Sequence, residues 1–275
     1  MLSWKRGLIT CIAVTAVVIL WNTNVPYTSE EGYTNKMAVT DLMNTINLLK
    51  MERNKLSSQL NIARRDMGQY QCEKTKNTTI DKGGWCKAAT QNREGLTDQS
   101  LIQVLSKFLK DKTVGSFGDG PGLYKRDILK LGQVKLYDAY DGAPYIEETS
   151  EGRVNFLDLT IPQYGIPLYD WVVSLEVAEH IPSQYEHIYL DNIFRHAKEG
   201  IILSWAVPGQ GGVGHINNRP LNYVINVMGK NGFIRDERSS TFLQESATLP
   251  WIRTNIHVYR RKGQSFDHTV TSWFL

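Results

Sequence analysis

Segment 114–122, with the sequence VGSFGDGPG, concentrates four glycines after an amphipathic helical pattern. Glycine has no Cβ and readily adopts a positive φ, so such a turn at the end of a strand can bring main-chain N–H groups against a nucleotide. Gly122 comes one residue too early for the dinucleotide pattern GxGxxG, and no Gly-Lys-Ser/Thr follows. The spacing therefore disfavours a dehydrogenase and a P-loop ATPase; a turn without a ligand is the alternative.

The segments that follow alternate between strand and helix patterns. Short apolar strand patterns occupy residues 134–140, 153–159, 170–175 and 200–206. A helical pattern covers residues 185–197, and this alternation is typical of a parallel sheet with crossover helices. Residues 232–236 and 255–260 are close enough to pair as an antiparallel hairpin at a sheet edge. We expect an α/β fold.

Two acidic residues, Asp138 and Asp141, end the first strand pattern after the glycine segment. An acidic side chain about twenty residues beyond such a turn can accept hydrogen bonds from both ribose hydroxyls. Asp141 is favoured because DGAPYIEE resembles a strand-end carboxylate followed by a proline-containing helix start. Asp138 is the competing candidate.

Five motifs together resemble the strand-end motifs of the class I S-adenosylmethionine-dependent methyltransferases. They are GSFGDGPG, YDAYDG, FLDL, DWVVSLEVAEHIP and GIILSWAVPGQGGVGHIN. The last two are similar to those of the membrane-anchored methyltransferase-like protein 24 group. The resemblance covers roughly residues 101–261 and implies a Rossmann-like class I methyltransferase sheet with an antiparallel edge hairpin, with S-adenosylmethionine as the cofactor.

The resemblance also implies the residues that contact the cofactor. These are Gly118, Gly120, Gly122, Asp141, Asp158, Leu159 and Glu176. Asp141 would hold the ribose hydroxyls, Asp158 would bond the adenine amino group, and Glu176 would border the sulfonium. The family usually has an acidic residue two positions before the first motif glycine, where this chain has Ser116; Asp119 can substitute in part.

Methyl transfer depends mainly on positioning and on exclusion of water, so it needs few dedicated side chains. His180 and His215 are candidate bases for an acceptor that must lose a proton, because imidazole titrates near neutral pH. A structural role, such as a bond to a carbonyl group, is the alternative for each. Glu176 and Glu179 also read as solvated carboxylates. The cysteines have no neighbouring ligand cluster, so no metal site is expected.

Two functions are therefore open. The first is methyl transfer to an unidentified acceptor, and the second is a methyltransferase-fold protein that has lost catalysis and acts as a binding or scaffold module. Ser116 favours the second. The net charge of +3, with scattered Lys and Arg, gives no reason to expect a nucleic-acid partner.

Residues 1–27 resemble a cytosolic tip followed by a signal anchor. Lys5 and Arg6 precede the uncharged residues 8–21, and no small-residue cleavage pattern follows. The acidic residues Glu30 and Glu31 on the other side orient the amino terminus to the cytosol. We expect a single-pass type II membrane protein of the endoplasmic reticulum or Golgi with a lumenal catalytic domain; a secreted protein is the alternative.

Residues 28–70 carry a heptad pattern that predicts a helical coiled-coil stem and a homodimer. Its a and d positions are Val39, Leu42, Ile46, Leu49, Arg53, Leu56, Leu60, Ala63 and Met67. Arg53 interrupts the apolar repeat, and a two-stranded seam would tolerate it best because its head can reach water. The alternative is a single amphipathic helix that packs against the catalytic domain.

Residues 71–100 read as a linker with a cysteine pair, Cys72 and Cys86, around the glycosylation acceptor Asn77-Thr78-Thr79. In an oxidising compartment a disulfide here would stabilise the fold by about 3 kcal/mol in the chain-entropy model. Residues 101–261 form the predicted methyltransferase domain, and residues 262–275 a loosely ordered tail.

Overall fold

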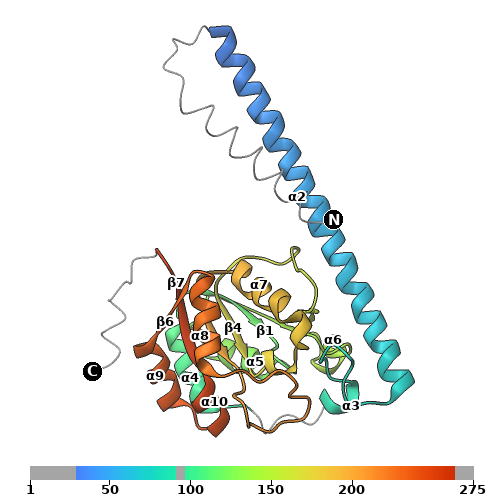
Figure 1. The fold of residues 1–275 in the computed structure, drawn as a ribbon, viewed down its shortest axis with the longest axis vertical. Helices are drawn as coiled ribbons and strands as arrows, with labels where there is room; N and C mark the ends of the chain where they lie inside the picture. The colour runs from blue at the N-terminus through green and yellow to red at the C-terminus, as the bar shows by residue number, and fades with distance from the viewer. Residues whose placement is uncertain (1–28, 91–96, 264–275) are drawn as a thin grey trace. The chain divides into compact units, whose positions relative to one another are not determined.

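The computed structural model describes residues 29–90 and 97–263, and its chain divides into two compact units, Met1–Glu52 and Arg53–Leu275 (Figure 1). The predicted signal anchor, residues 1–27, lies outside the described residues. Among those described, no helix has the length and apolar character needed to cross a bilayer.

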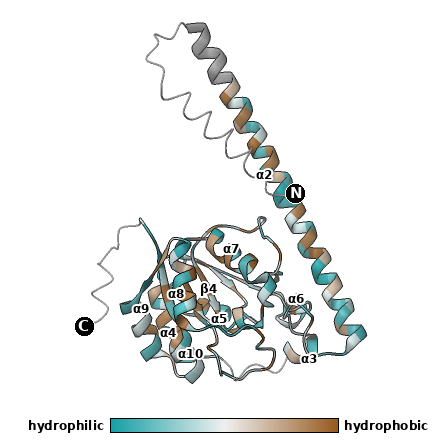
Figure 2. Cartoon of the chain, in the orientation of Figure 1, coloured by the Kyte–Doolittle hydropathy of each residue, from teal (hydrophilic) through white to brown (hydrophobic). Residues whose placement is uncertain are grey.

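Helix α2 (Ser29–Thr75) confirms the helix predicted for the stem and extends five residues beyond its expected end at 70. Within the first unit, residues 38–52 of this helix are all exposed, including the heptad residues Val39, Leu42, Ile46 and Leu49. Figure 2 shows apolar and polar residues interleaved along α2. The coiled-coil partner stays a prediction.

The second unit is built on a seven-stranded sheet of order β3-β2-β1-β4-β5-β7-β6. Its strands are β1 (Thr113–Phe117), β2 (Leu136–Asp141), β3 (Asn155–Phe156), β4 (Tyr169–Leu175), β5 (Ala197–Ser204), β6 (Phe233–Asp236) and β7 (His257–Arg261). Strands β1 to β5 pair in parallel, whereas β7 is antiparallel to both β5 and β6. The predicted α/β sheet with an antiparallel pair at its edge is confirmed.

The antiparallel pair differs from a hairpin in its connection. Two helices, α9 (Glu237–Ser246) and α10 (Pro250–Asn255), separate β6 from β7, and β6 rather than β7 forms the edge of the sheet. The sequence indicated the pairing because both segments have strand patterns, but the two helices in the connection were not predicted.

Helices cover both faces of the sheet, as buried apolar residues on each side show. On one face, α4 (Gln99–Phe108), α5 (Leu123–Lys130), α9 and α10 contribute to one apolar cluster. On the other, α7 (Glu186–His196) and α8 (Leu221–Lys230) contribute to a second. Two short helices, α3 (Lys87–Thr90) and α6 (Ile146–Thr149), complete the set of described α-helices.

The chain leaves β1 for β2 on one side and later returns to β4 on the other side. In open α/β sheets, the point where the strand order reverses leaves a crevice outside the carboxyl ends of the strands. The crevice between β1 and β4 is therefore where a ligand is expected.

Candidate active site

A cavity of about 1110 Å³ lies at this crevice, at the carboxyl ends of β1, β2 and β4. The sequence-predicted residues that line it are Gly118, Gly120, Asp141, Asp158, Leu159, Glu176, His180 and His215. Gly122 is the exception. It is the N-cap residue of α5 with φ +80°, and a Cβ there would stand 2.7 Å from Val154 Cγ2, so its role is close packing beside the cavity.

The glycine turn after β1 is held by the neighbouring strand. The N–H groups of Gly118 and Asp119 donate to the Tyr140 carbonyl at 2.7 and 3.0 Å, and Gly120 N–H donates to Asp141 Oδ2 at 2.9 Å. The expectation that these N–H groups face a ligand is therefore wrong, because β2 already accepts their hydrogen bonds. Gly120 (φ +59°) has no atom within 4 Å of a Cβ position, so the turn leaves open space in the cavity.

The two acidic candidates at β2 have different surroundings. The Asp141 carboxylate lines the cavity and accepts from the N–H groups of Gly120 and Ala143, the latter at 2.8 Å. Asp138 accepts from the Tyr169 hydroxyl at 2.9 Å and does not line the cavity. The structure therefore places Asp141, the favoured candidate, at the predicted position.

Asp119 lies beside Ser116. Position 116 is the one at which class I methyltransferases usually have an acidic residue. The Ser116 hydroxyl donates to Asp119 Oδ1 at 2.6 Å, and the Tyr137 hydroxyl donates to the same oxygen at 3.2 Å. Burial raises the pKa of Asp119 to about 6, despite these hydrogen bonds. Both Ser116 and Asp119 line the cavity, so an acidic group is present there even though position 116 is serine.

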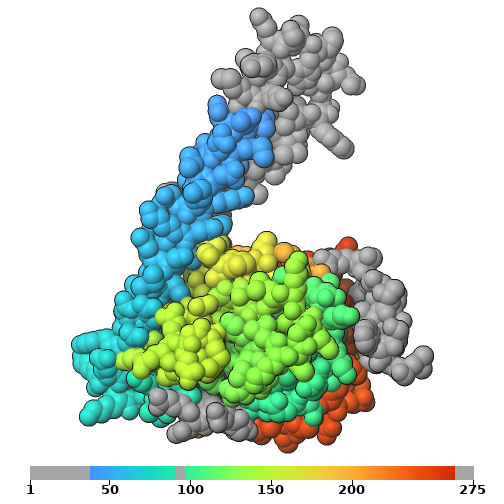
Figure 3. All heavy atoms as spheres, turned by 180° about the vertical axis from the view of Figure 1, so that it is seen from behind, coloured from blue at the N-terminus to red at the C-terminus, as the bar shows by residue number. Residues whose placement is uncertain are grey.

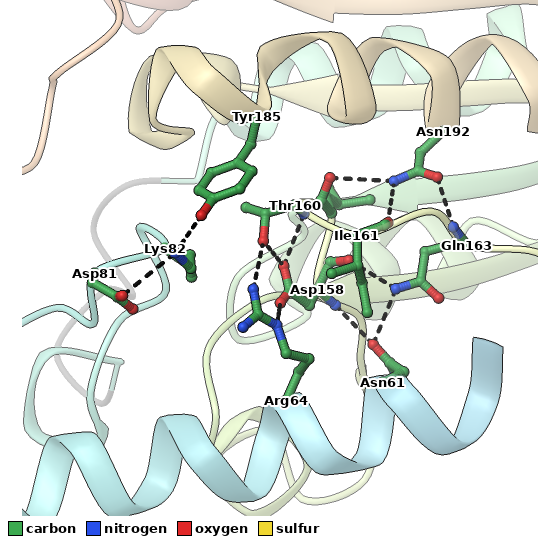
Figure 4. Close-up of polar contacts among 11 residues, drawn as sticks. Asn61, Arg64, Asp81, Lys82, Asp158, Thr160, Ile161, Gln163, Tyr185 and Asn192 are labelled. Carbon is green, nitrogen blue, oxygen red and sulfur yellow. Dashed lines mark hydrogen bonds and ion pairs between the residues drawn. The ribbon is translucent and has the colours of Figure 1, made fainter. Parts of the chain in front are cut away.

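Asp158, expected to bond adenine, is held by other residues of the chain (Figure 4). Arg64 Nε of α2 donates to Asp158 Oδ2 at 2.9 Å, while the N–H and hydroxyl groups of Thr160 donate to Oδ1 at 2.8 and 2.6 Å. Asn61, one turn before Arg64, donates to the Phe156 carbonyl and accepts from Asp158 N–H, both at 2.9 Å. Neither Arg64 nor Asn61 was among the site residues predicted from the sequence.

The part of α2 from Arg53 to Thr75 lies against the rest of its unit (Figure 3). Polar and small residues make this contact. Ser57 donates to the Pro162 carbonyl and accepts from Tyr164 N–H. At Gly68, a Cβ would stand only 2.6 Å from Pro144 Cγ. The contact residues Ser57, Asn61, Arg64 and Gly68 recur every three or four positions, so they lie on one face of the helix. This spacing of polar and small residues is the sequence signal that could have identified the face.

The heptad residues of this part of α2 point elsewhere. Leu56, Leu60 and Met67 are 62%, 46% and 61% exposed. Residues 53–75 of α2 therefore pack against the catalytic domain, as the alternative predicted, but through the polar face and not through the heptad face. The second compact unit of the structure begins at Arg53, within the predicted stem of residues 28–70.

The predicted cysteine pair is confirmed as a disulfide, Cys72–Cys86, with a Cα–Cα distance of 5.7 Å. The loop that it closes is more than a linker, because residues 80–85 form part of the cavity wall. A Cβ at Gly83 or Gly84 would stand 2.2 Å from the carbonyl oxygen of His180 or Gly142 respectively. The two glycines therefore allow the loop to approach the segments after β4 and β2.

Glu176 follows β4 with φ +54°, a backbone conformation that is unfavourable for a residue with a side chain. Its carboxylate accepts from Gln210 Nε2 at 2.9 Å and from Asn255 Nδ2 at 3.3 Å. These bonds hold Glu176 at the cavity. Strain of this kind is often found at functional sites.

The alternative reading of Glu179 as a solvated carboxylate is wrong, because its side chain is fully buried. Burial raises its pKa to about 9, and the nearby charge of Glu176 adds to the effect. The two candidate bases adjoin it: the rings of His180 and His215 lie edge to face with centroids 5.0 Å apart, and His215 Nε2 is 4.0 Å from Glu179 Oε1. His180 Nδ1 also lies 3.1 Å from the Gly214 carbonyl, as its structural alternative predicted.

Comparisons with protein-family models and with curated proteins found no match. Among solved structures, the similar chains include class I S-adenosylmethionine-dependent methyltransferases. Magnesium protoporphyrin IX methyltransferase from Synechocystis PCC 6803 with bound S-adenosylmethionine is 15% identical, with a TM-score of 0.45, over 72% of this chain and 97% of that one. N-methyltransferase NodS from Bradyrhizobium japonicum WM9, in complex with S-adenosylhomocysteine, is 13% identical, with a TM-score of 0.44, over 58% and 84%.

Proposed function

We propose that this chain is an S-adenosylmethionine-dependent methyltransferase, similar to the methyltransferase-like protein 24 group, with an unidentified acceptor. One observation carries the proposal: Asp141 at the end of β2 bonds the glycine turn after β1, and both face the cavity where the strand order reverses. A strand-end carboxylate beside a glycine turn is an arrangement suited to a nucleoside with two ribose hydroxyls.

The residues of the cavity fit this cofactor. Asp141 would accept from the ribose hydroxyls, since a carboxylate has about four acceptor positions. The open space at Gly120 admits the cofactor close to the backbone, and Asp119 would accept from its ammonium group. Asp158 would share its carboxylate between Arg64 and the adenine amino group. The volume, about 1110 Å³, slightly exceeds that of an ordinary small-molecule site, so an acceptor can enter beside the cofactor.

When bound, S-adenosylmethionine supplies a methyl group on a sulfonium. The chain's residues then contribute orientation and exclusion of water, with Leu159 and Val177 among the apolar residues of the wall. For an acceptor that must lose a proton, an imidazole nitrogen of His180 or His215 would accept it.

Calorimetric titration of the full chain with S-adenosylmethionine tests the proposal. Asp141→Ala should weaken binding by roughly 1–3 kcal/mol, or about 5- to 150-fold, because the ribose hydroxyls lose a charged acceptor. Asp138→Ala is the matched control and should change the affinity much less, since Asp138 bonds Tyr169 outside the cavity. The reverse order would contradict the role of Asp141, and a wild-type chain that does not bind would contradict the function.

A scaffold protein without catalysis is the second candidate. It is favoured by the bonds that already occupy the Asp158 carboxylate and the N–H groups of Gly118 and Asp119. The same titration separates the two, because a scaffold need not bind S-adenosylmethionine.

We also propose that the chain is a type II membrane protein anchored by residues 1–27, with its second unit in the lumen of the secretory pathway. The Cys72–Cys86 disulfide supports an oxidising compartment, and Asn77 is exposed within the loop that it closes. A glycosidase-sensitive mass shift that Asn77→Gln removes would support this topology. Exposure of residues 71–90 to a cytosolic protease would contradict it.

A further inference from the structure

Three side chains with metal-binding atoms meet at the end of the cavity beyond β4. Glu179 and His180 belong to the 3₁₀ turn Ala178–His180, and His215 comes from the loop after β5. One ligand atom from each residue can be chosen so that all three lie within 4.8 Å of one another. Two atoms bound to one ion about 2.0–2.2 Å away can be at most about 4.4 Å apart, so small side-chain shifts would bring these three around a common centre.

Two members of the cluster, Glu179 and His215, have buried polar atoms that form no hydrogen bond with the described residues. The Glu179 side chain is fully buried, and neither of its carboxylate oxygens has a hydrogen-bond partner in the described part of the chain. His215 Nδ1 is also buried, and none of the described residues bonds it. Nearly all buried polar groups in proteins are hydrogen-bonded, and an unsatisfied one costs free energy unless something else binds it. A cation between these groups would satisfy the carboxylate.

His180 is oriented as metal-binding histidines commonly are. Its Nδ1 lies 3.1 Å from the Gly214 carbonyl oxygen, a contact in which Nδ1–H is the donor. In that tautomer Nε2 carries the lone pair with which a neutral imidazole binds a metal, and such a bond to a carbonyl fixes the ring. Gly83 of the disulfide-closed loop packs against the His180 backbone from the other side.

We propose that Glu179, His180 and His215 form a binding site for a divalent transition-metal ion such as Zn²⁺. Two imidazoles and one carboxylate are a donor set that Zn²⁺ uses where it keeps a fourth position open. His180 and His215 line the cavity, so the open position faces it and can take an oxygen atom of a cavity occupant. This site goes beyond the proposed function, because binding of the ion does not require S-adenosylmethionine.

The site also changes the role of the two histidines. A metal-bound imidazole nitrogen has no lone pair with which to accept a proton, so His180 and His215 would be ligands rather than bases. The expectation of no metal site was drawn from the cysteines alone. Glu179 and His180 are adjacent in sequence, but His215 is brought to them only by the fold.

Metal binding to the full chain tests the inference. The purified chain is stripped with a chelator, dialysed against Zn²⁺ or Co²⁺, and analysed by inductively coupled plasma mass spectrometry and, for Co²⁺, by visible absorption. We expect one ion per chain. For Co²⁺, we expect the visible absorption of a four-coordinate site. Glu179→Gln and His215→Ala should each weaken binding more than about 100-fold, beyond the loss usual for residues that only orient a ligand.

His187→Ala is the matched control, because His187 is exposed on α7 and does not belong to the cluster, and it should bind the ion as the wild type does. Near-UV circular dichroism checks that each variant is folded. If His215→Ala does not fold, the near-isosteric variant Glu179→Gln still tests the site. A wild-type chain without stoichiometric metal, or a Glu179→Gln variant with wild-type affinity, would overturn the site. Titration with S-adenosylmethionine alone reports on the proposed function separately.

Discussion

Helix α2 presents two faces between Arg53 and Thr75 that differ in what they contact. The face that packs on the rest of the unit carries Ser57, Asn61, Arg64 and Gly68. The heptad face carries the exposed residues Leu56, Leu60, Ala63 and Met67. The contrast shows that the hydrophobic period identifies a face whose apolar residues stay exposed among the described residues, whereas the contact with the rest of the unit is polar.

A physical reason for the polar contact lies in the segment that α2 covers. Strand β3 has only two residues, so the chain after it has main-chain groups that no further strand pairs. Asn61 and Ser57 bond such groups at Phe156, Asp158, Pro162 and Tyr164. Buried main-chain N–H and C=O groups need partners, and apolar side chains would leave them unsatisfied.

Arg64→Met should have the largest effect on stability. It removes the cation from Asp158, whose side chain is 9% exposed, and leaves Thr160 as the donor to this carboxylate. We expect the free energy of unfolding to fall by roughly 3 kcal/mol, the lower end for breaking a buried ion pair. Chemical denaturation of the full chain, followed by tryptophan fluorescence, measures it.

A double-mutant cycle with Asp158→Asn isolates the pair from other effects of each substitution. The combined variant should lose clearly less than the sum of the two single losses. Additive losses would mean that Arg64 and Asp158 do not stabilise each other, and the polar face would then lose its central contact.

Arg64 also marks the limit of what the sequence could predict. The strands and Asp141 were predictable because apolar runs and strand-end acids are local patterns. Arg64 is separated from Asp158 by 94 residues, and no local pattern connects them. The same limit applies to the cluster of Glu179, His180 and His215. Each histidine was identified by itself from the sequence, but the burial of Glu179 depends on how the loops after β4 and β5 fold together.

Gly68→Leu should have the next largest effect. A Cβ at this position would lie 2.6 Å from Pro144 Cγ and 3.4 Å from Ile80 Cδ1, so a larger side chain forces the helix away from the unit. Overpacking of this kind typically costs about 1–3 kcal/mol, more than the gain in helix propensity over glycine. The same denaturation measurement detects it, and a stability equal to the wild type would show that the helix is not closely docked at Gly68.

Arg53→Leu should have a smaller effect and tests the boundary between the two faces. Arg53 is a heptad a residue, yet its guanidinium lies 4.2 Å from the centroid of the Tyr164 ring. An exposed cation–π contact is worth about 0.5–1 kcal/mol, so we expect a loss of that size, with Arg53→Lys closer to the wild type. If Arg53 instead lay in an apolar coiled-coil seam, where a charge is costly, Arg53→Leu would raise the stability; a measured gain would therefore favour the seam.

Leu60→Glu should change the stability of the unit least, by less than about 0.5 kcal/mol, because Leu60 is 46% exposed. We propose that a second copy of the chain covers the heptad face, since the same apolar repeat continues from Val39 to Met67. A glutamate at this a position would then be buried in the seam, so the full chain should change from dimer to monomer. Sedimentation equilibrium in density-matched detergent measures this.

Ile62→Glu is the matched control for Leu60→Glu. Ile62 lies two residues further along α2, is 50% exposed, and stands outside the a and d positions of the heptad. Because the added charge and the exposure are nearly the same, only the heptad position distinguishes the two variants, and Ile62→Glu should remain dimeric. A monomeric wild-type chain would remove the second copy from the heptad face, whereas dissociation of both variants would mean that the chains meet through a broader surface than the heptad seam.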